Sequence, residues 1–218
     1  MIEFHNVSKR YPGGREALRN VSLSVATGEM VFLTGHSGAG KSTLLRLTAL
    51  IERSTQGQII VGGQNLSRVP RRRIPLFRRN IGIVFQNPRL LADRTVFDNV
   101  ALPLVIAGMS HRESTRRVRA ALDQVGLLGR ERDHPVVLSG GEQQRVGIAR
   151  AVVSKPPVLL ADEPTGNLDP VLSREIMNLF ERFNQFGVTL LIATHDLELL
   201  GHFRHRILSL RQGGFEHA

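Results

Sequence analysis

The segment Gly35–Ser42, which reads GHSGAGKS, constrains the fold of this chain more than any other feature. It follows the short apolar run MVFLT and precedes KSTLLRLTALI, which has a helical pattern. The segment matches the pattern G-x-x-x-x-G-K-[ST], in which a glycine-rich backbone wraps around phosphate groups. Because the following helix adds its positive end to the backbone N–H groups, the segment predicts a phosphate site between a strand and a helix.

Within this loop, Lys41 is expected to reach the β- and γ-phosphates of a nucleotide, and the Ser42 hydroxyl is expected to ligate Mg²⁺. ATP and Mg²⁺ are therefore the predicted cofactors. The alternative, a glycine-rich turn that matches by chance, does not explain the position between strand and helix. The residues predicted to bind nucleotide here are Gly35, His36, Ser37, Gly38, Ala39, Gly40, Lys41, Ser42 and Thr43.

Short apolar runs alternate with helical patterns along most of the chain, which favours an α/β fold with a mostly parallel sheet covered by helices on both faces. The predicted strands are IEFHNV, VSLSV, MVFLTG, GQIIVGG, IGIVFQ, PVLLAD and VTLLIA. From about residue 93 the pattern becomes helical, with apolar residues of 118–125 at helical spacing. We expect one domain over 1–218, with a helical subdomain of about 93–150 inserted in the core.

The strand VLLAD ends in an acidic pair, Asp162 and Glu163. Carboxylates at the carboxyl end of a central strand lie where α/β sheets bind their ligands. We expect Asp162 to hold Mg²⁺ and Glu163 to orient the attacking water, as phosphoryl-transfer sites require. An acid pair after a strand is otherwise a common start of a helix, and the phosphate loop favours the functional interpretation.

The net charge of +10 comes mostly from arginine, with clusters at 71–79 and 112–119. Such clusters suit nucleic acid or an anionic membrane surface. No aromatic residues interleave with them, so direct nucleic-acid binding is not expected, and solvated surface arginines or a nearby anionic membrane remain the alternatives. Cysteine is absent, the N-terminus lacks the apolar core of a secretory signal, and no apolar run approaches the ~18–20 residues of a membrane span. We expect a soluble protein whose membrane role comes through a partner.

Leu138–Gln144 reads LSGGEQQ, a Ser-Gly-Gly turn that opens a helix and forms a second candidate anion site. Here the sequence resembles the ATP-binding-cassette family, whose signature is LSGGQ, and the resemblance extends from the first strands to about Arg211. It implies a phosphate-loop nucleoside-triphosphatase core with an antiparallel β subdomain and a helical insertion. It also implies a homodimer on ATP binding, in which Ser139, Gly140 and Gly141 complete the site of the opposite subunit.

The same resemblance assigns further residues. Tyr11 matches the aromatic that stacks on adenine, although it could equally pack a strand. Gln86 matches the glutamine that senses Mg²⁺ and the γ-phosphate, while Asn87 stands where an acidic residue is common. Asp169 matches a residue that crosses the dimer interface, and His195 matches the switch histidine. The predicted catalytic residues are thus Lys41, Gln86, Glu163 and His195, and the predicted metal ligands are Ser42, Gln86 and Asp162.

The stretch EPTGNLD resembles the subgroup of this family that works with mechanotransmission-type membrane proteins in lipoprotein release, macrolide export and cell division. The segments FLTGHSGAGKSTLL, LLADRTVFDNVALPLVIAG and GVTLLIATHD look most like the cell-division members. This implies a Mg-ATP hydrolysing subunit at the cytoplasmic face of the bacterial inner membrane, paired with an integral-membrane protein that controls cell-wall hydrolysis. A lipoprotein-release or macrolide exporter is the first alternative, and a nucleic-acid-stimulated ATPase is the second.

Overall fold

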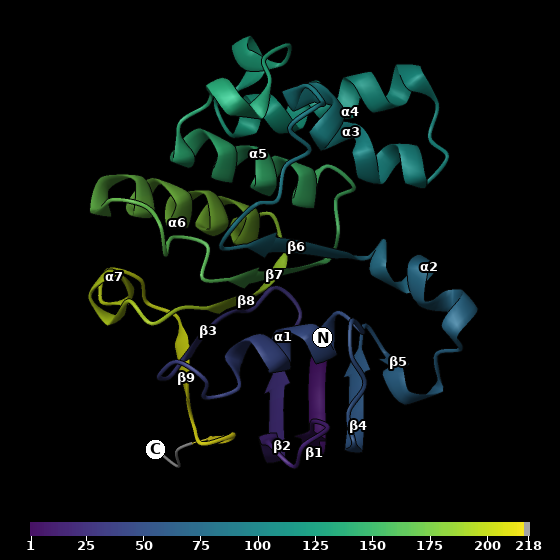
Figure 1. The fold of residues 1–218 in the computed structure, drawn as a ribbon, viewed down its shortest axis with the longest axis vertical. Helices are drawn as coiled ribbons and strands as arrows, with labels where there is room; N and C mark the ends of the chain where they lie inside the picture. The colour runs from purple at the N-terminus through teal and green to yellow at the C-terminus, as the bar shows by residue number, and fades with distance from the viewer. Residues whose placement is uncertain (216–218) are drawn as a thin grey trace.

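A computed structural model describes residues 1–215 of the chain, which form two sheets and several helices. The first sheet has four antiparallel strands in the order β2-β1-β4-β5 (Figure 1). Its strands are β1 (Ile2–Arg10), β2 (Glu16–Val25), β4 (Gln56–Val61) and β5 (Gln64–Asn65). The turn between β1 and β2 contains Gly13 and Gly14, both at positive φ, a conformation that glycine adopts without steric cost.

The second sheet has six strands in the order β10-β9-β3-β8-β7-β6. The strands are β3 (Met30–Thr34), β6 (Ile81–Phe85), β7 (Val158–Asp162), β8 (Thr189–Ala193), β9 (Arg206–Arg211) and β10 (Gly214–Phe215). All neighbours are parallel except β9 and β10. Phe85 pairs with Asp162, and Asp162 pairs with Ala193, so the central strands end at one common edge. The loops that follow these strands therefore emerge side by side.

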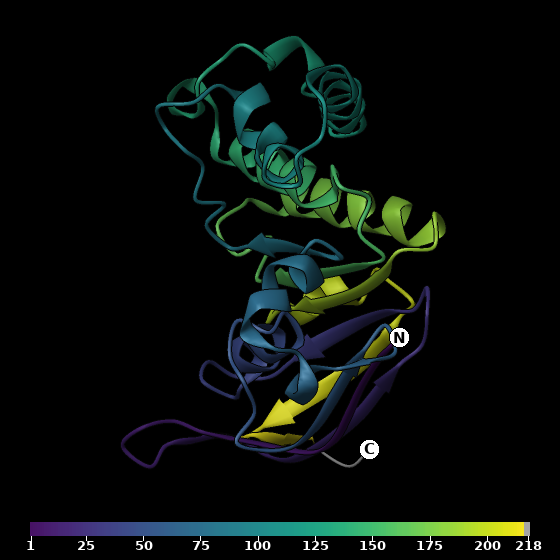
Figure 2. The ribbon, with the colours of Figure 1, turned by 90° about the vertical axis from the view of Figure 1, so that its right-hand side faces the viewer.

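Two layers of helices enclose the parallel strands (Figures 1 and 2). The helices are α1 (Lys41–Thr48), α2 (Ile74–Arg78), α3 (Val96–Ile106), α4 (His111–Gln124), α5 (Gly140–Val152), α6 (Pro170–Gln185) and α7 (Leu197–Leu200), with short 3₁₀ turns at Leu66–Arg68, Arg71–Arg73, Leu128–Arg130 and Pro135–Val137. Figure 2 shows α3–α5 at one end of the molecule and the antiparallel strands at the other. The predicted α/β core, antiparallel part and helical insertion are confirmed.

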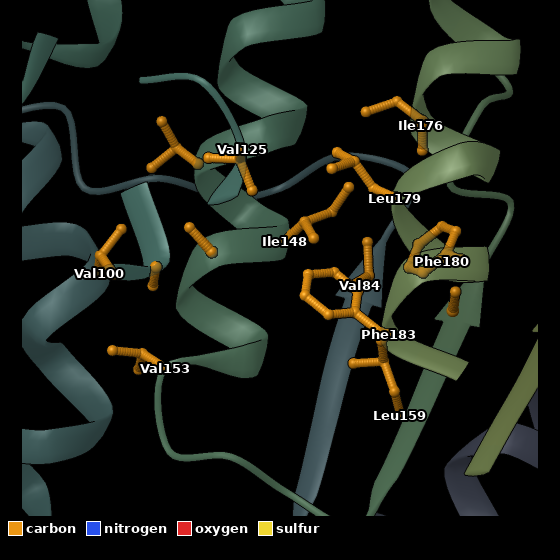
Figure 3. Packing of buried hydrophobic residues seen from close by; sticks show 14 of the residues in the cluster. Val84, Val100, Val125, Ile148, Val153, Leu159, Ile176, Leu179, Phe180 and Phe183 are labelled. Carbon is orange, nitrogen blue, oxygen red and sulfur yellow. The ribbon is translucent and has the colours of Figure 1, made fainter. Parts of the chain in front are cut away.

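Alternate residues of the central strands enter two hydrophobic cores, because successive side chains of a strand point to opposite faces. Val31 and Leu33 pack with α1 and the antiparallel sheet, whereas Phe32 packs with the helices α3–α6. Figure 3 shows Ile148 of α5 and Phe180 of α6 in the same cluster as the strand residues Val84 and Leu159. The helical layer thus packs against the sheet through a continuous hydrophobic core. No helix among residues 1–215 is long and apolar enough to span a lipid bilayer.

Candidate functional site

The glycine-rich loop joins β3 to α1 at the common edge of the parallel strands. Gly40 has φ 114°, and a Cβ atom there would lie 2.5 Å from the carbonyl oxygen of Ala17, so only glycine fits. Lys41 Nζ donates to the carbonyl oxygen of Gly35 at 2.6 Å, which holds the cation over the loop. Backbone N–H groups, a helix N-terminus and a lysine therefore surround one concave space, as phosphate binding requires.

Ser42 and Asp162 form an oxygen pair beside the loop. The Ser42 hydroxyl donates to Asp162 Oδ1 at 3.0 Å, although the two residues lie on different elements. Burial raises the pKa of Asp162, and the hydrogen bond from Ser42 opposes that rise, while the neighbouring Glu163 charge adds to it. A hydroxyl and a carboxylate suit Mg²⁺, which takes few protein ligands and completes its shell with water and substrate phosphates. The residues present therefore fit this ion.

Glu163 begins the loop after β7 and contacts residues at the end of β8. Its Oε2 lies 2.5 Å from His195 Nδ1, and its Oε1 lies 3.6 Å from Lys41 Nζ. Its backbone has φ 49°, an uncommon conformation for a non-glycine residue, and its N–H donates to the carbonyl oxygen of Ala193 at 2.9 Å. Strained backbone of this kind is concentrated at functional sites. The geometry presents one carboxylate toward the space above the phosphate loop.

A cavity of about 840 Å³ brings most of the predicted residues together. Its lining includes Tyr11, His36, Ser37, Gly38, Ala39, Gly40, Lys41, Ser42, Thr43, Gln86, Glu163 and His195. Gly35 and Asp162 lie at its margin through their contacts with Lys41 and Ser42. Gln86 enters from the end of β6, and its amide nitrogen lies 3.4 Å from Asn167 Oδ1. Five segments that are distant in sequence thus form one pocket.

Tyr11 stands at the mouth of this cavity and is held from several sides. Its hydroxyl lies 3.3 Å from Thr43 Oγ1, and Lys9 Nζ lies 5.0 Å from its ring centroid. Burial raises the pKa of Tyr11 above its ordinary value. A fixed aromatic face beside a phosphate loop is suited to stacking on a base.

Ser139, Gly140, Gly141 and Asp169 do not line the cavity of their own chain. Ser139 is the N-cap of α5: its hydroxyl oxygen accepts from Glu142 N–H, and its own N–H donates to the Glu142 carboxylate at 2.8 Å. A Cβ atom on Gly141 would lie 2.9 Å from Leu172, whereas Gly140 faces open space. Asp169 caps α6 through the N–H groups of Val171 and Leu172. The signature turn therefore contributes no residue to the lining of this pocket.

Several residues that the motifs did not single out also shape the site. Arg15 and Arg46 line the cavity, so it carries more positive charge than the loop alone supplies. Gln144 of α5 donates to the carbonyl oxygen of Phe85 at 3.0 Å, and Arg150 of α5 donates to the carbonyls of Pro88 and Arg89. The sequence indicates the contacts of Gln144 and Arg150 only through their position as polar residues on the buried face of a predicted helix.

A sequence profile of the ABC transporter family matches residues 18–166. The cell division ATP-binding protein FtsE of Escherichia coli strain K12 is 59% identical over 213 residues, covering 98% of this chain and 96% of the relative. The protein of the same name from Haemophilus influenzae is 53% identical and covers 98% of each chain.

Among solved structures, the dimeric ATP-binding cassette MJ0796 in a post-hydrolysis state, bound to ADP and Pi, is similar with a TM-score of 0.90. The two sequences are 36% identical, and the match covers 100% of this chain and 97% of the other. The similarity therefore extends over the whole fold.

Proposed function

This chain belongs to the ABC transporter family, and we propose that it is the Mg-ATP hydrolysing subunit of an FtsEX-type membrane complex in cell division. It is an ATPase, which binds ATP and converts it with water to ADP and phosphate. In the proposed complex, ATP-driven dimerisation at the cytoplasmic face of the bacterial inner membrane controls cell-wall hydrolysis through an FtsX-like integral-membrane partner. The observation that carries the proposal is the arrangement of Glu163, His195 and Lys41 around one cavity.

The residues of this cavity divide the work of phosphoryl transfer. The loop N–H groups and Lys41 would hold the β- and γ-phosphates, and Ser42, Asp162 and Gln86 would hold Mg²⁺, which would neutralise phosphate charge. Glu163 orients the attacking water, and His195 fixes the Glu163 carboxylate by its contact at 2.5 Å. Because Lys41 Nζ lies 3.6 Å from Glu163, the carboxylate is held close to the phosphate end of the site.

We propose that the signature residues act in trans. Ser139 and Gly140 form the exposed turn at the start of α5, and Asp169 starts α6 nearby in the same helical layer. None of them reaches the cavity of its own chain, so a second copy would be needed to bring them to a nucleotide. The dimeric cassette among the similar structures supports this arrangement. The proposed unit is one domain of 1–218 with a helical subdomain of about 93–150.

The membrane partner is proposed to dock beside Gln86. A second cavity of about 500 Å³ shares Ser42 and Gln86 with the nucleotide cavity and opens toward Ile51 and Arg89. Ile51 and Leu91 are about two-fifths exposed. Apolar side chains such as Leu45 and Ile83 line this cleft together with polar and charged ones, a mixture that is suited to a short amphipathic helix of the partner.

The segment from Gln86 to about Leu104 follows β6 and is rich in apolar residues that could contact such a helix, but the structure limits which of them are available. Leu104 is buried in the helical core, whereas the following residues Val105 and Ile106 are exposed. Leu90 also packs against the core, so Leu91 is the better probe of the surface. The exposed large apolar side chains from Gln86 to the end of α3 are therefore Leu91, Val105 and Ile106, while Ile51 lines the cleft itself.

The hydrogen bonds of α5 connect the signature turn to the loop after β6. Gln144 holds the Phe85 carbonyl before Gln86, and Arg150 holds the Pro88 and Arg89 carbonyls after it. Burial lowers the pKa of Arg150, yet its carbonyl partners satisfy the guanidinium. A displacement of Gln86 by the partner would move α5, and the reverse holds because coupling between sites is reciprocal.

Purification of the protein from its native membrane tests the proposal. We expect an FtsX-like integral-membrane protein to copurify in stoichiometric amount with the tagged chain in mild detergent, because an ATPase of this kind acts through a membrane partner. A tagged Leu91→Asp chain is the matched control, since its nucleotide site is intact. Recovery of lipoprotein-release or macrolide-export membrane proteins instead would assign the chain to a transporter.

A further inference from the structure

A third cavity, of about 710 Å³, lies at the end of the parallel sheet opposite the nucleotide site. Pro156 and Pro157, which line it, precede β7, and Gly187 and Val188 precede β8. The nucleotide cavity lies where those strands end, so the sheet separates the two. Neither the nucleotide cavity nor the cleft beside Gln86 shares a lining residue with this groove, which we call the back groove.

The floor of the back groove is apolar. Val153 and Phe183 belong to the main hydrophobic core, as Figure 3 shows, and they form its base together with the partly exposed Val152. Phe186, which ends α6, is 80% exposed, the largest value among the exposed large hydrophobic side chains of residues 1–215. Exposed aromatic surface next to an apolar hollow is typical of a surface that another molecule covers.

The walls of the back groove carry positive charge. Arg116 and Arg117 of α4 both donate to the Glu113 carboxylate, at 2.9 and 2.8 Å. These two hydrogen bonds lower the pKa of Glu113 to about 2, so the group is ionised at neutral pH. One carboxylate can neutralise only one of the two guanidinium groups. Lys155 lines the other wall, and no ion pair joins it to any residue described by the structure.

Lys155 occupies an unusual backbone position. It follows α5 with φ 54°, and its N–H donates to the carbonyl oxygen of Val152 at 2.8 Å. Helices commonly end in this left-handed conformation, but glycine or asparagine is the usual residue there. The turn therefore holds a lysine at the groove where glycine, which has no Cβ atom, would be less strained.

We propose that the back groove binds an acidic amphipathic helix of a second protein, in addition to the membrane partner of the proposed function. The apolar floor would take leucine or phenylalanine anchors of one helix face, as helix-in-groove recognition does. Carboxylates beside those anchors would pair with Arg116, Arg117 and Lys155. A flat bilayer does not fill a concave floor, and the groove has only one exposed aromatic for stacking on nucleic-acid bases, so a peptide fits these features better.

Binding of designed peptides to the purified full chain tests this. The probe is a fluorescein-labelled helical peptide with leucine or phenylalanine at i, i+4 and i+7 and glutamate beside them, and the readout is fluorescence anisotropy. We expect saturable binding that falls at least ~10-fold in Phe186→Ser and in the Arg116→Glu/Lys155→Glu double variant. Arg72→Glu, which reverses an exposed arginine outside the groove, is the matched control and should bind normally. ATP hydrolysis should be unchanged in all of these variants.

Exchanging the charges of the peptide and the groove tests whether binding depends on their electrostatic pairing. A peptide in which lysine replaces glutamate should bind the Arg116→Glu/Lys155→Glu variant better than the unchanged chain. Near-ultraviolet circular dichroism and the thermal melting midpoint show whether each variant is folded. The proposal is overturned if the acidic peptide does not bind, or if it binds the folded variants as tightly as the unchanged chain. It is also overturned if these substitutions weaken the binding of phosphatidylglycerol vesicles or duplex DNA but not the binding of the peptide.

Cross-linking in cells identifies the natural occupant. Because the chain has no cysteine, Gln124→Cys places a single thiol at the edge of the groove, and Arg72→Cys provides a control outside it. After reaction with a thiol-directed photocross-linker, mass spectrometry should find an acidic amphipathic segment of another protein attached to residue 124 and absent from residue 72. Attachment only to lipid, to nucleic acid or to a second copy of this chain would overturn the proposal.

Discussion

At the scale of single residues, the conformation of Glu163 depends on contacts with other elements as well as on its position after β7. Its left-handed backbone costs about 1 kcal/mol or more, and it persists because the N–H donates to Ala193 and the carboxylate contacts His195 and Lys41. These contacts come from β8 and from the phosphate loop. A carboxylate fixed in this way can orient a water molecule without first reorganising, which is how preorganised groups lower a barrier.

Replacing Glu163 with glutamine tests its role as the base. We expect Glu163→Gln to bind ATP with little loss and to hydrolyse it at least ~100-fold more slowly, because an amide cannot accept the proton of the attacking water. Nucleotide binding by fluorescence and phosphate release measure the two effects separately. Glu181→Gln is the matched control, since Glu181 makes a similar 2.5 Å contact with His205 outside the cavity. Near-normal turnover of Glu163→Gln would place the base elsewhere.

At the scale of elements, α5 has a role beyond carrying the signature turn. It begins with the capping box of Ser139 and Glu142, and farther along it holds the loop after β6 through Gln144 and Arg150. Ile148 of the same helix and Val153, which caps its C-terminus, pack into the core. Because one helix begins at the turn proposed to meet a second subunit and holds the loop proposed to meet a membrane partner, we expect it to transmit motion between them.

The capping charge of α5 makes a prediction about pH. The backbone N–H of Ser139 donates to Glu142 and lowers the pKa of that carboxyl, so its stabilising effect is present above the unfolded pKa of about 4.3 and is lost as pH falls through the lower folded value. Glu142→Gln should lower the stability by about 0.5 kcal/mol at pH 7, the usual effect of a charge at a helix N-terminus. The difference in melting midpoint should disappear in acid.

A charge at the other end of a helix provides the control for that experiment. Asp123 lies in the last turn of α4, where a negative charge is unfavourable, so Asp123→Asn should not destabilise the protein at pH 7. A loss of stability in Glu142→Gln that stays constant down to acid pH would mean that the charge of the cap is not what stabilises α5.

The surface beside β6 is tested by Leu91→Asp. We expect this change to abolish recruitment of the protein to membranes that contain its partner, because a charge would enter the proposed apolar contact. ATP binding should be spared, since Leu91 does not line the nucleotide cavity. Ile207→Asp, a comparably exposed apolar residue on β9, is the control. Membrane fractionation of Leu91→Asp at the level of the unchanged protein would place the docking site elsewhere.

At the scale of the whole molecule, the parallel sheet separates different surfaces. The nucleotide cavity lies at the carboxyl ends of its strands, and the back groove lies at the amino ends of β7 and β8. The signature turn does not line the cavity of its own chain. One fold can therefore bind nucleotide with a second copy on one side while other surfaces stay available to partners.

Composite sites predict complementation between two inactive variants. Lys41→Ala should weaken nucleotide binding, and Ser139→Arg should place a bulky charge in the signature turn. In a mixture, some dimers would have one intact site and one site with both changes, so part of the ATPase activity should return when the two purified variants are mixed. The Glu163→Gln chain should also form ATP-dependent dimers in light scattering, because bound nucleotide supplies part of the interface.

Two observations would contradict the composite site. Mixtures that show only the summed activity of the separate variants would mean that Ser139 does not act on the site of another chain. A Glu163→Gln chain that stays monomeric with saturating ATP would contradict the dimer itself. Mixing Lys41→Ala with itself at the same total concentration is the control for a simple concentration effect.

The local pattern of the sequence was enough to predict the fold class and the elements that carry the phosphate loop, Asp162 and Glu163. Such motifs depend on residues that are adjacent in the chain, and strands buried on both faces are apolar throughout, so both can be read without a structure. The roles of Ser139, Asp169 and Tyr11 rested on resemblance, and they stay predictions.

Only the tertiary structure decided which side chains meet. In the folded chain, Glu163 has a left-handed backbone, and Arg15 and Arg46 line the cavity. Leu104 is buried, whereas Val105 is exposed. The tertiary structure also formed the back groove from α4, the end of α5 and the end of α6. These features depend on contacts between segments far apart in sequence, and hydrophobic periodicity, which reports only the average face that an element buries, does not contain them.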